Sequence, residues 1–407
     1  MSKRVLIVAA TTGYQTRSFV EAAKRTGIEV TLATDRCHVL DDPWGDHAIP
    51  IRFENPEIAA EVAAATGPVD GVVGLGDRAA YIASLAAERL GVPFHPPRAV
   101  EACNSKFLLK ERFQKAGLPV PGYRLIPLAD DPGEAARTTT YPCVLKPLSL
   151  SASRGVIRAN DAGEFVAAFH RIAAILRGRG ESLLVEDFIE GREFALEGIM
   201  TNGRLGVLVI FDKPDPLDGP FFEETIYVTP SREDARTQQA IVVAAEKAVN
   251  ALGLWHGPVH AEMRGNSSGV WMLEVAARPI GGLCARVLPG LEELILHHLV
   301  AKNTSKVGKN MPKTIPKTSA HGVMMIPIPR EGVYVSVAGI ESANAVPWIE
   351  DTIVTAKEGQ KLVPLPEGNS YLGFIFAKAD TPEQVEFALR EAHSKLNFEI
   401  LTALKVV

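Results

Sequence analysis

The chain has 407 residues, of which 46% are hydrophobic and 22% are charged, a composition typical of a globular protein with two or three lobes. The formal net charge of -5 and the absence of interleaved basic and aromatic residues argue against a nucleic-acid partner. No apolar run approaches the roughly 20 residues that cross a bilayer, so we expect no membrane partner and a cytoplasmic location. The four cysteines, Cys37, Cys103, Cys143 and Cys284, form no CxxC motif, which predicts buried thiols instead of a zinc site or disulfides.

Residues 1–100 alternate between strand-like and helix-like segments. Strands are expected at RVLIVAA, EVTLAT and GVVGLG, and helices from Gln15 to Arg25 and after Asp77. This alternation predicts a small parallel sheet. The segment GLGDRA, residues 74–79, fits a dinucleotide-binding pattern only weakly, because it follows a late strand and no acidic residue lies about twenty positions on.

Residues 101–302 begin with a helix and then become rich in strands. Asn104 is the expected N-cap of a helix that ends near Gly117. From Tyr141 onward antiparallel strands predominate, with a turn at residues 201–203 and helices at 162–177 and 234–251.

The last hundred residues divide into a linker and a final unit. Residues 303–319 are polar, basic and contain prolines, so they predict a linker. Residues 320–407 predict a C-terminal α+β domain, in which Thr381, Pro382 and Gln384 form the capping-box start of a helix.

The sequence VHAEMRGNSSGVWMLEVAAR, residues 259–278, predicts a β-hairpin that carries two glutamates. Apolar and polar residues alternate on both sides of a glycine- and serine-rich turn. With the turn centred near Ser267, Glu262 lies diagonal to Glu274 on one face. Two converging carboxylates need a shared proton or a cation, and a hard divalent metal is the simpler answer.

Lys146 ends an apolar run and is followed by PLSLSASRGV, a loop rich in small residues. The backbone N–H groups of this loop are free to bind phosphate oxygens, and Arg154 adds a positive charge. A flexible surface loop is the alternative interpretation of the same residues. The segment VEDFIEGREF predicts a hinge that offers backbone groups to a planar base, with Glu193 placed for a ribose. Taken singly, each glutamate of this segment is also interpreted as a solvent-exposed surface charge.

Three further features follow the hairpin or belong to it. Arg278 is suited to grip a phosphoryl group in a bidentate way, and a salt bridge to Glu274 is the structural alternative. His260 shares a face with Glu262, where it either touches substrate or supports its neighbours by hydrogen bonds. Gly281 and Gly282 mark a turn or a close approach of substrate to the backbone.

In this order, the motifs resemble the ATP-grasp superfamily over nearly the whole chain. In NSKFLLKERFQKAGLPVPGY, Lys106 matches the first ATP-binding lysine and Lys146 the second, while residues 149–155, including Ser153, match the phosphate-covering loop. EDFIEGRE matches the nucleotide hinge, which implies adenine contacts at Glu186 and Ile189 and a ribose contact at Glu193. Glu262 and Glu274 match the two magnesium-binding acids, and Arg278 matches the phosphate-binding arginine.

The resemblance implies an α/β and α+β fold with three kinds of lobe. Residues 1–100 would form a Rossmann-like N-terminal domain and residues 101–302 the ATP-grasp domain, with a small lid at about 130–195. The lobes after the lid would contain antiparallel sheets. Ala276 replaces an asparagine that many relatives carry in an ExNxR arrangement, so one oxygen ligand for a second metal is missing.

HAE, EVAARPIGG and PREGVYVSVAGIE are similar to the L-amino-acid ligase branch, whose members join carboxylates to amines through an acyl phosphate. The implied cofactors are ATP and Mg²⁺ or Mn²⁺, and Lys146, Arg154 and Arg278 would offset charge during phosphoryl transfer. His260, Gly281 and Gly282 would contact the small-molecule substrates, for which residues 221–227 offer one wall. Both a monomer and a homodimer are compatible with the sequence. An ATP-dependent carboxylase of the biotin-carboxylase type and a non-catalytic nucleotide-binding module are the alternative functions.

Overall fold

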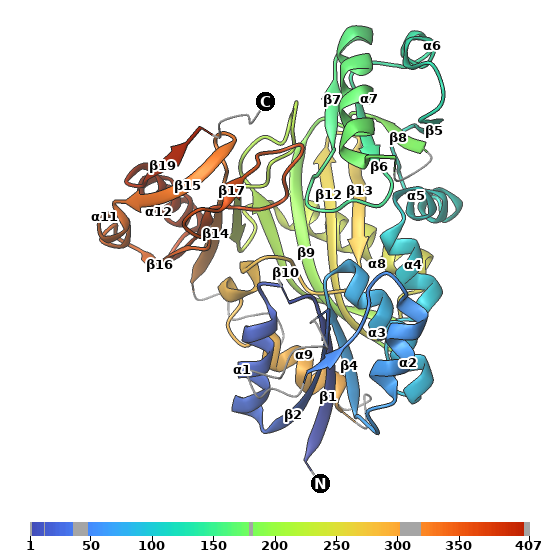
Figure 1. Cartoon of the computed structure of the whole chain (residues 1–407), viewed down its shortest axis with the longest axis vertical. Helices are drawn as coiled ribbons and strands as arrows, with labels where there is room; N and C mark the ends of the chain where they lie inside the picture. The colour runs from blue at the N-terminus through green and yellow to red at the C-terminus, as the bar shows by residue number, and fades with distance from the viewer. Residues whose placement is uncertain (1, 12, 36–47, 179–181, 302–318, 403–407) are drawn as a thin grey trace.

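The computed structural model describes residues 2–11, 13–35, 48–178, 182–301 and 319–402. Its first part is a four-stranded parallel sheet of order β3-β2-β1-β4, at the bottom of Figure 1. After Lys3 and Arg4, strand β1 is apolar and buried because helices cover the sheet: α1 packs against β2, and α3 packs against β1 and β4. The elements are β1 (Lys3–Ala9), α1 (Thr16–Thr26), β2 (Ile28–Thr34), β3 (Ile49–Pro50), α2 (Pro56–Ala64), β4 (Gly71–Leu75) and α3 (Asp77–Leu90).

Two short helices, α4 (Pro97–Asn104) and α5 (Lys106–Lys115), lead away from this lobe. The predicted N-cap was wrong by one residue. Asn104 ends α4, and its side chain donates a hydrogen bond to the Asp77 carbonyl at 3.0 Å. Ser105 is the N-cap of α5, because its hydroxyl accepts from the Leu108 N–H.

A small antiparallel sheet of order β5-β8-β6-β7 forms the lid, at the top of Figure 1. Helix α7 covers it with Phe165, Phe169 and Ile172, which recur at helical spacing and are buried. The observed sheet begins before residue 130, and residues 192–195 belong to a different sheet. The lid elements are β5 (Tyr123–Pro127), α6 (Pro132–Arg137), β6 (Cys143–Pro147), β7 (Ile157–Ala159), α7 (Ala162–Leu176) and β8 (Ser182–Asp187).

An eight-stranded sheet of order β13-β12-β9-β10-β11-β14-β18-β16 forms the centre of the molecule. The turn between β9 and β10 lies at Asn202 and Gly203, both with positive φ, as the sequence predicted. The elements of its first half are β9 (Arg192–Thr201), β10 (Arg204–Lys213), β11 (Ile226–Thr229), α8 (Ala235–Leu252), β12 (Gly257–Asn266), β13 (Gly269–Ala276), η1 (Cys284–Val287) and α9 (Leu291–Leu299).

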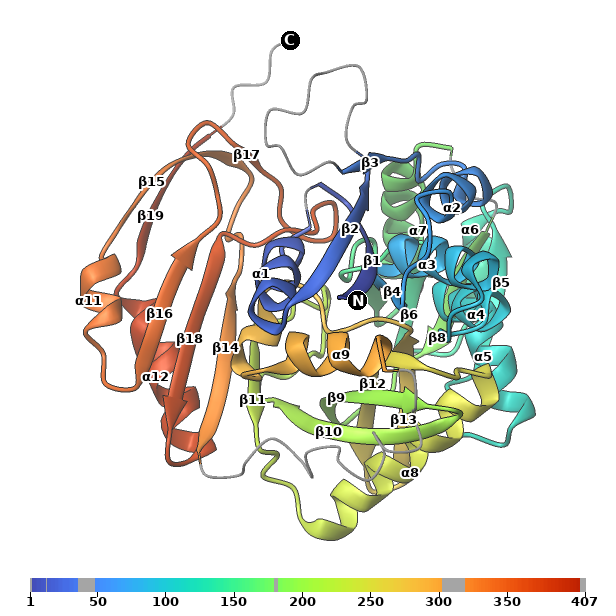
Figure 2. The same cartoon turned by 90° about the horizontal axis from the view of Figure 1, so that it is seen from below.

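The C-terminal unit continues this sheet instead of forming a separate one, since β11 pairs directly with β14 (Figure 2). Helix α12 begins with the predicted capping box of Thr381 and Gln384. A second, three-stranded sheet of order β17-β15-β19 completes the unit. Its elements are β14 (Ala320–Ile326), β15 (Gly332–Ala338), α11 (Ile340–Asn344), β16 (Ile349–Val354), β17 (Lys361–Leu362), β18 (Gly373–Ala379), α12 (Pro382–Ser394) and β19 (Asn397–Leu401).

Some sequence expectations concern residues that the structure does not describe. Of the predicted linker 303–319, only Ser319 lies among the described residues, and Cys37 also lies outside them. Cys103, Cys143 and Cys284 are free and buried, as expected. Within the described part of the chain, no helix is both long and apolar enough to cross a membrane.

Three buried histidines lie together beneath the central sheet. The rings of His256 and His298 stack with their centroids 4.3 Å apart, and neither nitrogen of His256 has a hydrogen-bond partner among the described residues. His95 Nε2 donates to the Pro258 carbonyl at 3.0 Å, while Nδ1 accepts from the Trp255 N–H. Burial lowers the pKa of His95 to about 3 and that of His256 to about 4, so both are neutral near pH 7.

These depressed pKa values predict acid lability. The unfolded state binds protons below the ordinary histidine pKa of about 6.5, whereas the folded state resists protonation down to about pH 4. Stability is therefore fully present above about pH 6.5 and is lost as the pH falls toward 4. His256→Leu should change the free energy of unfolding little at pH 7.5. Between pH 7.5 and pH 4.5 this free energy should fall by about 2–3 kcal/mol less in the variant than in wild type. Urea unfolding at both pH values measures this, with the exposed His170→Leu as control. An equal decrease in the free energy of unfolding between the two pH values in wild type and His256→Leu would contradict this prediction.

Candidate functional site

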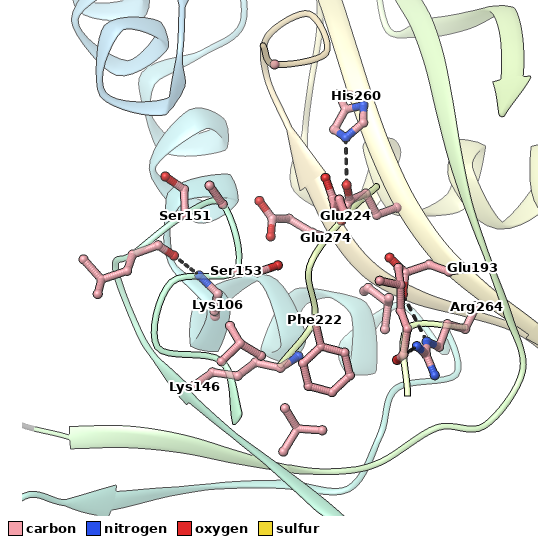
Figure 3. Close-up of a pocket in the computed structure, with 18 of the residues that line it drawn as sticks. Lys106, Lys146, Ser151, Ser153, Glu193, Phe222, Glu224, His260, Arg264 and Glu274 are labelled. Atoms are coloured by element: carbon pink, nitrogen blue, oxygen red, sulfur yellow. Dashed lines mark hydrogen bonds and ion pairs between the residues drawn. The ribbon is translucent and has the colours of Figure 1, made fainter. Parts of the chain in front are cut away.

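A cavity of about 260 Å³ lies where the lid faces the central sheet. Lid residues line one side of it, and strands β9, β12 and β13 line the other. The cavity also reaches Arg278, which follows β13, and Met325 and Tyr371, which belong to the C-terminal unit. In Figure 3, Lys106, Ser151 and Ser153 lie on one side, opposite Glu193, Glu224 and His260.

Lys146 is held at the end of lid strand β6 by a buried carboxylate. Its Nζ lies 2.7 Å from Glu186 Oε2, and Lys110 Nζ lies 3.6 Å from Glu186 Oε1. Burial disfavours the charged form of Glu186, but the two lysines outweigh it and lower the pKa of that carboxyl. Burial lowers the pKa of Lys110 to about 8. Glu186, expected at the adenine, therefore also orients the second predicted ATP-binding lysine.

The small-residue loop after β6 bends over the cavity. Ser151, Ala152 and Ser153 line it, and Ala152 and Ser153 both have a φ of 54°. Lys106 Nζ donates to the carbonyl of Leu150 in the same loop. Arg154 is not among the residues that line this cavity. Its Nε donates to the Glu367 carbonyl at 2.8 Å, and it lines an adjoining pocket together with Lys106 and Glu274. The expectation that Arg154 acts at the reacting phosphate stays a prediction.

The hinge segment lies between the lid and β9, where Asp187, Phe188 and Ile189 line the cavity. The Ile189 carbonyl accepts a hydrogen bond from Arg264 Nη1 at 2.8 Å. Glu193 is buried, with Oε2 accepting from Arg264 Nε at 3.1 Å and Oε1 lying 2.9 Å from Lys213 Nζ. Glu193 lines the cavity, but both its oxygens already have cationic partners.

The predicted hairpin is present, but its register differs from the one expected. Residues 267 and 268 make a two-residue turn, and a bulge follows between Glu262 and Met263. The extra residue shifts the pairing so that Glu262 lies directly opposite Glu274. The diagonal placement was therefore wrong, because alternation does not reveal a bulge. Both carboxylates line the cavity.

Lys213 was missed by the sequence analysis, although it is the centre of the acidic side. Its Nζ lies 2.9 Å from Glu193, 2.7 Å from Glu224 and 3.1 Å from Glu262. Burial disfavours the ammonium ion, but the carboxylates raise the pKa of Lys213 well above its ordinary value. Burial raises the pKa of Glu224 to about 7. Lys213 is the last residue of the apolar strand β10, much as Lys146 lies near the end of β6. This position in the sequence could have identified Lys213 as a candidate site residue.

His260 lies between two carboxylates on the same face. Its Nδ1 contacts Glu197, and its Nε2 lies 3.1 Å from Glu262 Oε1. Burial disfavours the imidazolium, but Glu197 and Glu262 raise the pKa of His260 to about 10. His260 therefore carries a positive charge near pH 7. Glu197, which the sequence analysis did not select, also accepts from the Ile280 N–H at 3.0 Å.

Arg278 lies beyond the end of β13 and joins the cavity to the first lobe. Its Nε donates to Asp77 Oδ1 at 2.6 Å, so the alternative salt bridge to Glu274 was wrong. Asp77 begins α3, which gives the GLGDRA segment a structural role. Gly281 and Gly282 also line the cavity.

Three family models match successive parts of the chain. An ATP-grasp N-terminal domain matches residues 20–94, an ATP-grasp domain matches residues 139–287, and L-amino acid ligase C-terminal domain 2 matches residues 324–400. The matched segments follow the order of the first lobe, the lid with the central sheet, and the C-terminal unit.

Individual relatives agree with these models. The alanine–anticapsin ligase of Bacillus subtilis (strain 168) is 28% identical over 219 residues, which cover 48% of this chain and 45% of that protein. Carnosine synthase 1 of Gallus gallus is 26% identical over 379 residues, which cover 84% of this chain and 40% of that protein. The matches therefore span less than half of either relative.

The fold matches a solved structure over nearly its whole length. The crystal structure of an L-amino acid ligase from Bacillus licheniformis has a TM-score of 0.81 and 27% identity, covering 98% of this chain and 99% of that one. The chain is therefore an ATP-grasp protein by its domains and its fold, and it carries the C-terminal domain of the L-amino acid ligases.

Proposed function

We propose that the protein is an ATP-dependent ligase that joins the carboxylate of one small molecule to the amine of another. The observation that carries this proposal is the cavity itself. It is lined by Lys106 of α5, by Lys146 and the small-residue loop of the lid, by the Glu262–Glu274 pair, and by Arg278. This arrangement offers cations to phosphate oxygens and carboxylates to a metal within one cavity.

The cavity fits a nucleotide at the hinge and phosphates under the loop. Glu186 Oε1 is buried and has no hydrogen-bond partner among the described residues, so a donor such as an adenine amino group would satisfy it. Lys106 and Lys146 would hold the phosphates. Arg264 and Lys213 would fix Glu193 for the ribose.

Glu262 and Glu274 also fit a magnesium or manganese ion, because they are hard oxygen donors placed directly opposite one another. Such an ion, when bound, would offset negative charge on the phosphates. Ala276 adds no oxygen ligand; it pairs with His260 across the strands. Lys213 and His260 would keep Glu262 ionised, since both contribute to lowering the pKa of that carboxyl against the effect of burial.

The reaction needs two bond exchanges. A carboxylate oxygen of the first substrate would attack the γ-phosphorus, and the bond from that phosphorus to ADP would break. The amine would then attack the acyl carbon, phosphate would leave, and the amine would lose a proton. Lys146 and Arg278 would offset charge in the first exchange. Glu224 lines the cavity and would accept the proton in the second.

Water exclusion matters as much as charge, because an acyl phosphate hydrolyses readily. The small-residue loop of the lid, together with Phe222 and Tyr371, lines the cavity and would limit the access of water to it. Most of the chain's task would therefore be to position the substrates and exclude water, with little covalent chemistry of its own.

Lys146→Ala should weaken ATP binding about 10- to 100-fold, because it removes a charge-assisted contact to phosphate. Calorimetric titration with ATP measures the affinity. Lys115→Ala, on the exposed face of α5, is the matched control. Unchanged affinity in Lys146→Ala would favour a structural role for the Lys146–Glu186 pair.

Glu274→Gln should lower turnover by about 100-fold or more while preserving the fold, since it removes a negative charge with almost no change in volume. ADP release at several magnesium concentrations, with circular dichroism as the folding check, measures this. Glu246→Gln, on the exposed face of α8, is the control. A folded Glu274→Gln protein with normal turnover would refute the metal assignment.

The function is tested by ADP release with Mg-ATP across single amino acids, amino-acid pairs, and bicarbonate with and without amines. We expect release that requires both a carboxylate and an amine, with a condensation product detected by mass spectrometry. Release with bicarbonate and no amine would instead indicate a carboxylase. ATP binding without release under any condition would indicate a non-catalytic module.

A further inference from the structure

The loop between β17 and β18, residues 363–372, reaches from the C-terminal unit to the lid (Figure 1). The Pro366 carbonyl accepts from the Gly155 N–H at 2.9 Å, and the Glu367 carbonyl accepts from Arg154 Nε at 2.8 Å. The Glu367 carboxylate also binds Arg171 of α7 through two hydrogen bonds, of 2.6 and 2.9 Å. Two adjacent residues therefore contact both the phosphate-covering loop and the lid helix.

The β17–β18 loop is itself a tight turn. The Gly368 N–H donates to the Pro364 carbonyl at 2.8 Å, and a Cβ added to Gly368 would lie 1.7 Å from the Val363 carbonyl oxygen. Pro366 and Gly368 are buried. Because the turn is packed, Glu367 is presented to the lid in a defined position.

The contacts converge on residues next to the cavity. Arg154 and Gly155 directly follow Ser153, which lines it. Arg171 also lies over the Phe221 ring at 4.9 Å, and the next residue, Phe222, lines the cavity. The same β17–β18 loop contributes Tyr371 to the cavity wall. Movement of this loop would therefore alter both the cover and the wall of the cavity.

We propose that Glu367, Arg154 and Arg171 are positioning residues that hold the phosphate-covering loop closed, so that closure of the lid depends on the C-terminal unit. The catalytic consequence rests on the proposed ligase function. With the loop loosened, water would reach the acyl phosphate and hydrolyse it to carboxylate and phosphate. ADP would then be released without formation of the amide.

The first test measures the ratio of ADP released to condensation product formed. Glu367→Arg and Arg171→Glu should each raise this ratio about two- to five-fold, the range expected for one exposed bidentate pair. Arg154→Ala should raise it about ten-fold, since a charged donor to a carbonyl is lost. The double variant Arg171→Glu with Glu367→Arg should restore the wild-type ratio by re-forming the pair with reversed charges.

Glu331→Arg is the matched control, because Glu331 pairs with Lys361 at 3.1 Å within the C-terminal unit and is exposed. It should leave the ratio unchanged. A role limited to folding would lower total activity in all variants without changing the ratio, and the charge reversal would then not restore coupling. That outcome would overturn the proposal.

A second readout does not depend on catalysis. Hydrogen–deuterium exchange of a peptide covering residues 149–156 should be faster in Glu367→Arg and Arg154→Ala than in wild type, and unchanged in Glu331→Arg. If no substrate pair supports ADP release but exchange is faster, the ligase proposal fails and the loop contact stands. If exchange and the ratio are both unchanged in folded variants, the positioning proposal fails.

Discussion

One buried ammonium group makes the acidic side of the cavity possible. Three carboxylates, those of Glu193, Glu224 and Glu262, have oxygens within 4.8 Å of one another. Carboxylates this close in a buried setting repel one another, and at least one would take up a proton without a counter-charge. Lys213 Nζ lies within 3.1 Å of an oxygen from each of them and supplies that charge. Even so, burial raises the pKa of Glu224 to about 7, so the ammonium group does not fully compensate the charge of this carboxylate.

The lid side has the same construction with opposite signs. A single buried carboxylate, Glu186, lies between Lys110 and Lys146. Buried ion pairs are costly to desolvate and are weak sources of stability, but they fix the positions of their members. The two clusters therefore place cations and anions on opposite walls. A nucleotide triphosphate with its metal has the complementary distribution of charge.

The lobes around the cavity are tied together by contacts between distant parts of the chain. Asp77 of the first lobe holds Arg278, and the C-terminal unit extends the central sheet through β11 and β14. Through residues 366 and 367 the same unit reaches the lid. The C-terminal unit is therefore part of the framework of the site, and a family-specific domain at this place can influence both the cover and the wall of the cavity.

Local pattern was enough to predict the elements that carry the site. Alternation and turn residues predicted the β12–β13 hairpin, and the capping box predicted α12. The family motifs selected Lys106, Lys146 and Glu274, which all line the cavity. Arg154 was selected for its charge and its place beside a phosphate-like loop, but its guanidinium donates to the Glu367 carbonyl, because charge and sequence position do not determine the direction in which a side chain turns.

What the sequence by itself determined is the place of many of the strands, helices and turns, because backbone preference and hydrophobic period act over short distances. Only the tertiary structure decided the bulge that sets Glu262 opposite Glu274 and the meeting of Lys213 with three glutamates from three other segments. It also decided the contact between Glu367 and Arg171, which lie far apart in sequence. Such contacts depend on sheet order and lobe packing, and these arise from the sum of many distant interactions instead of any local pattern.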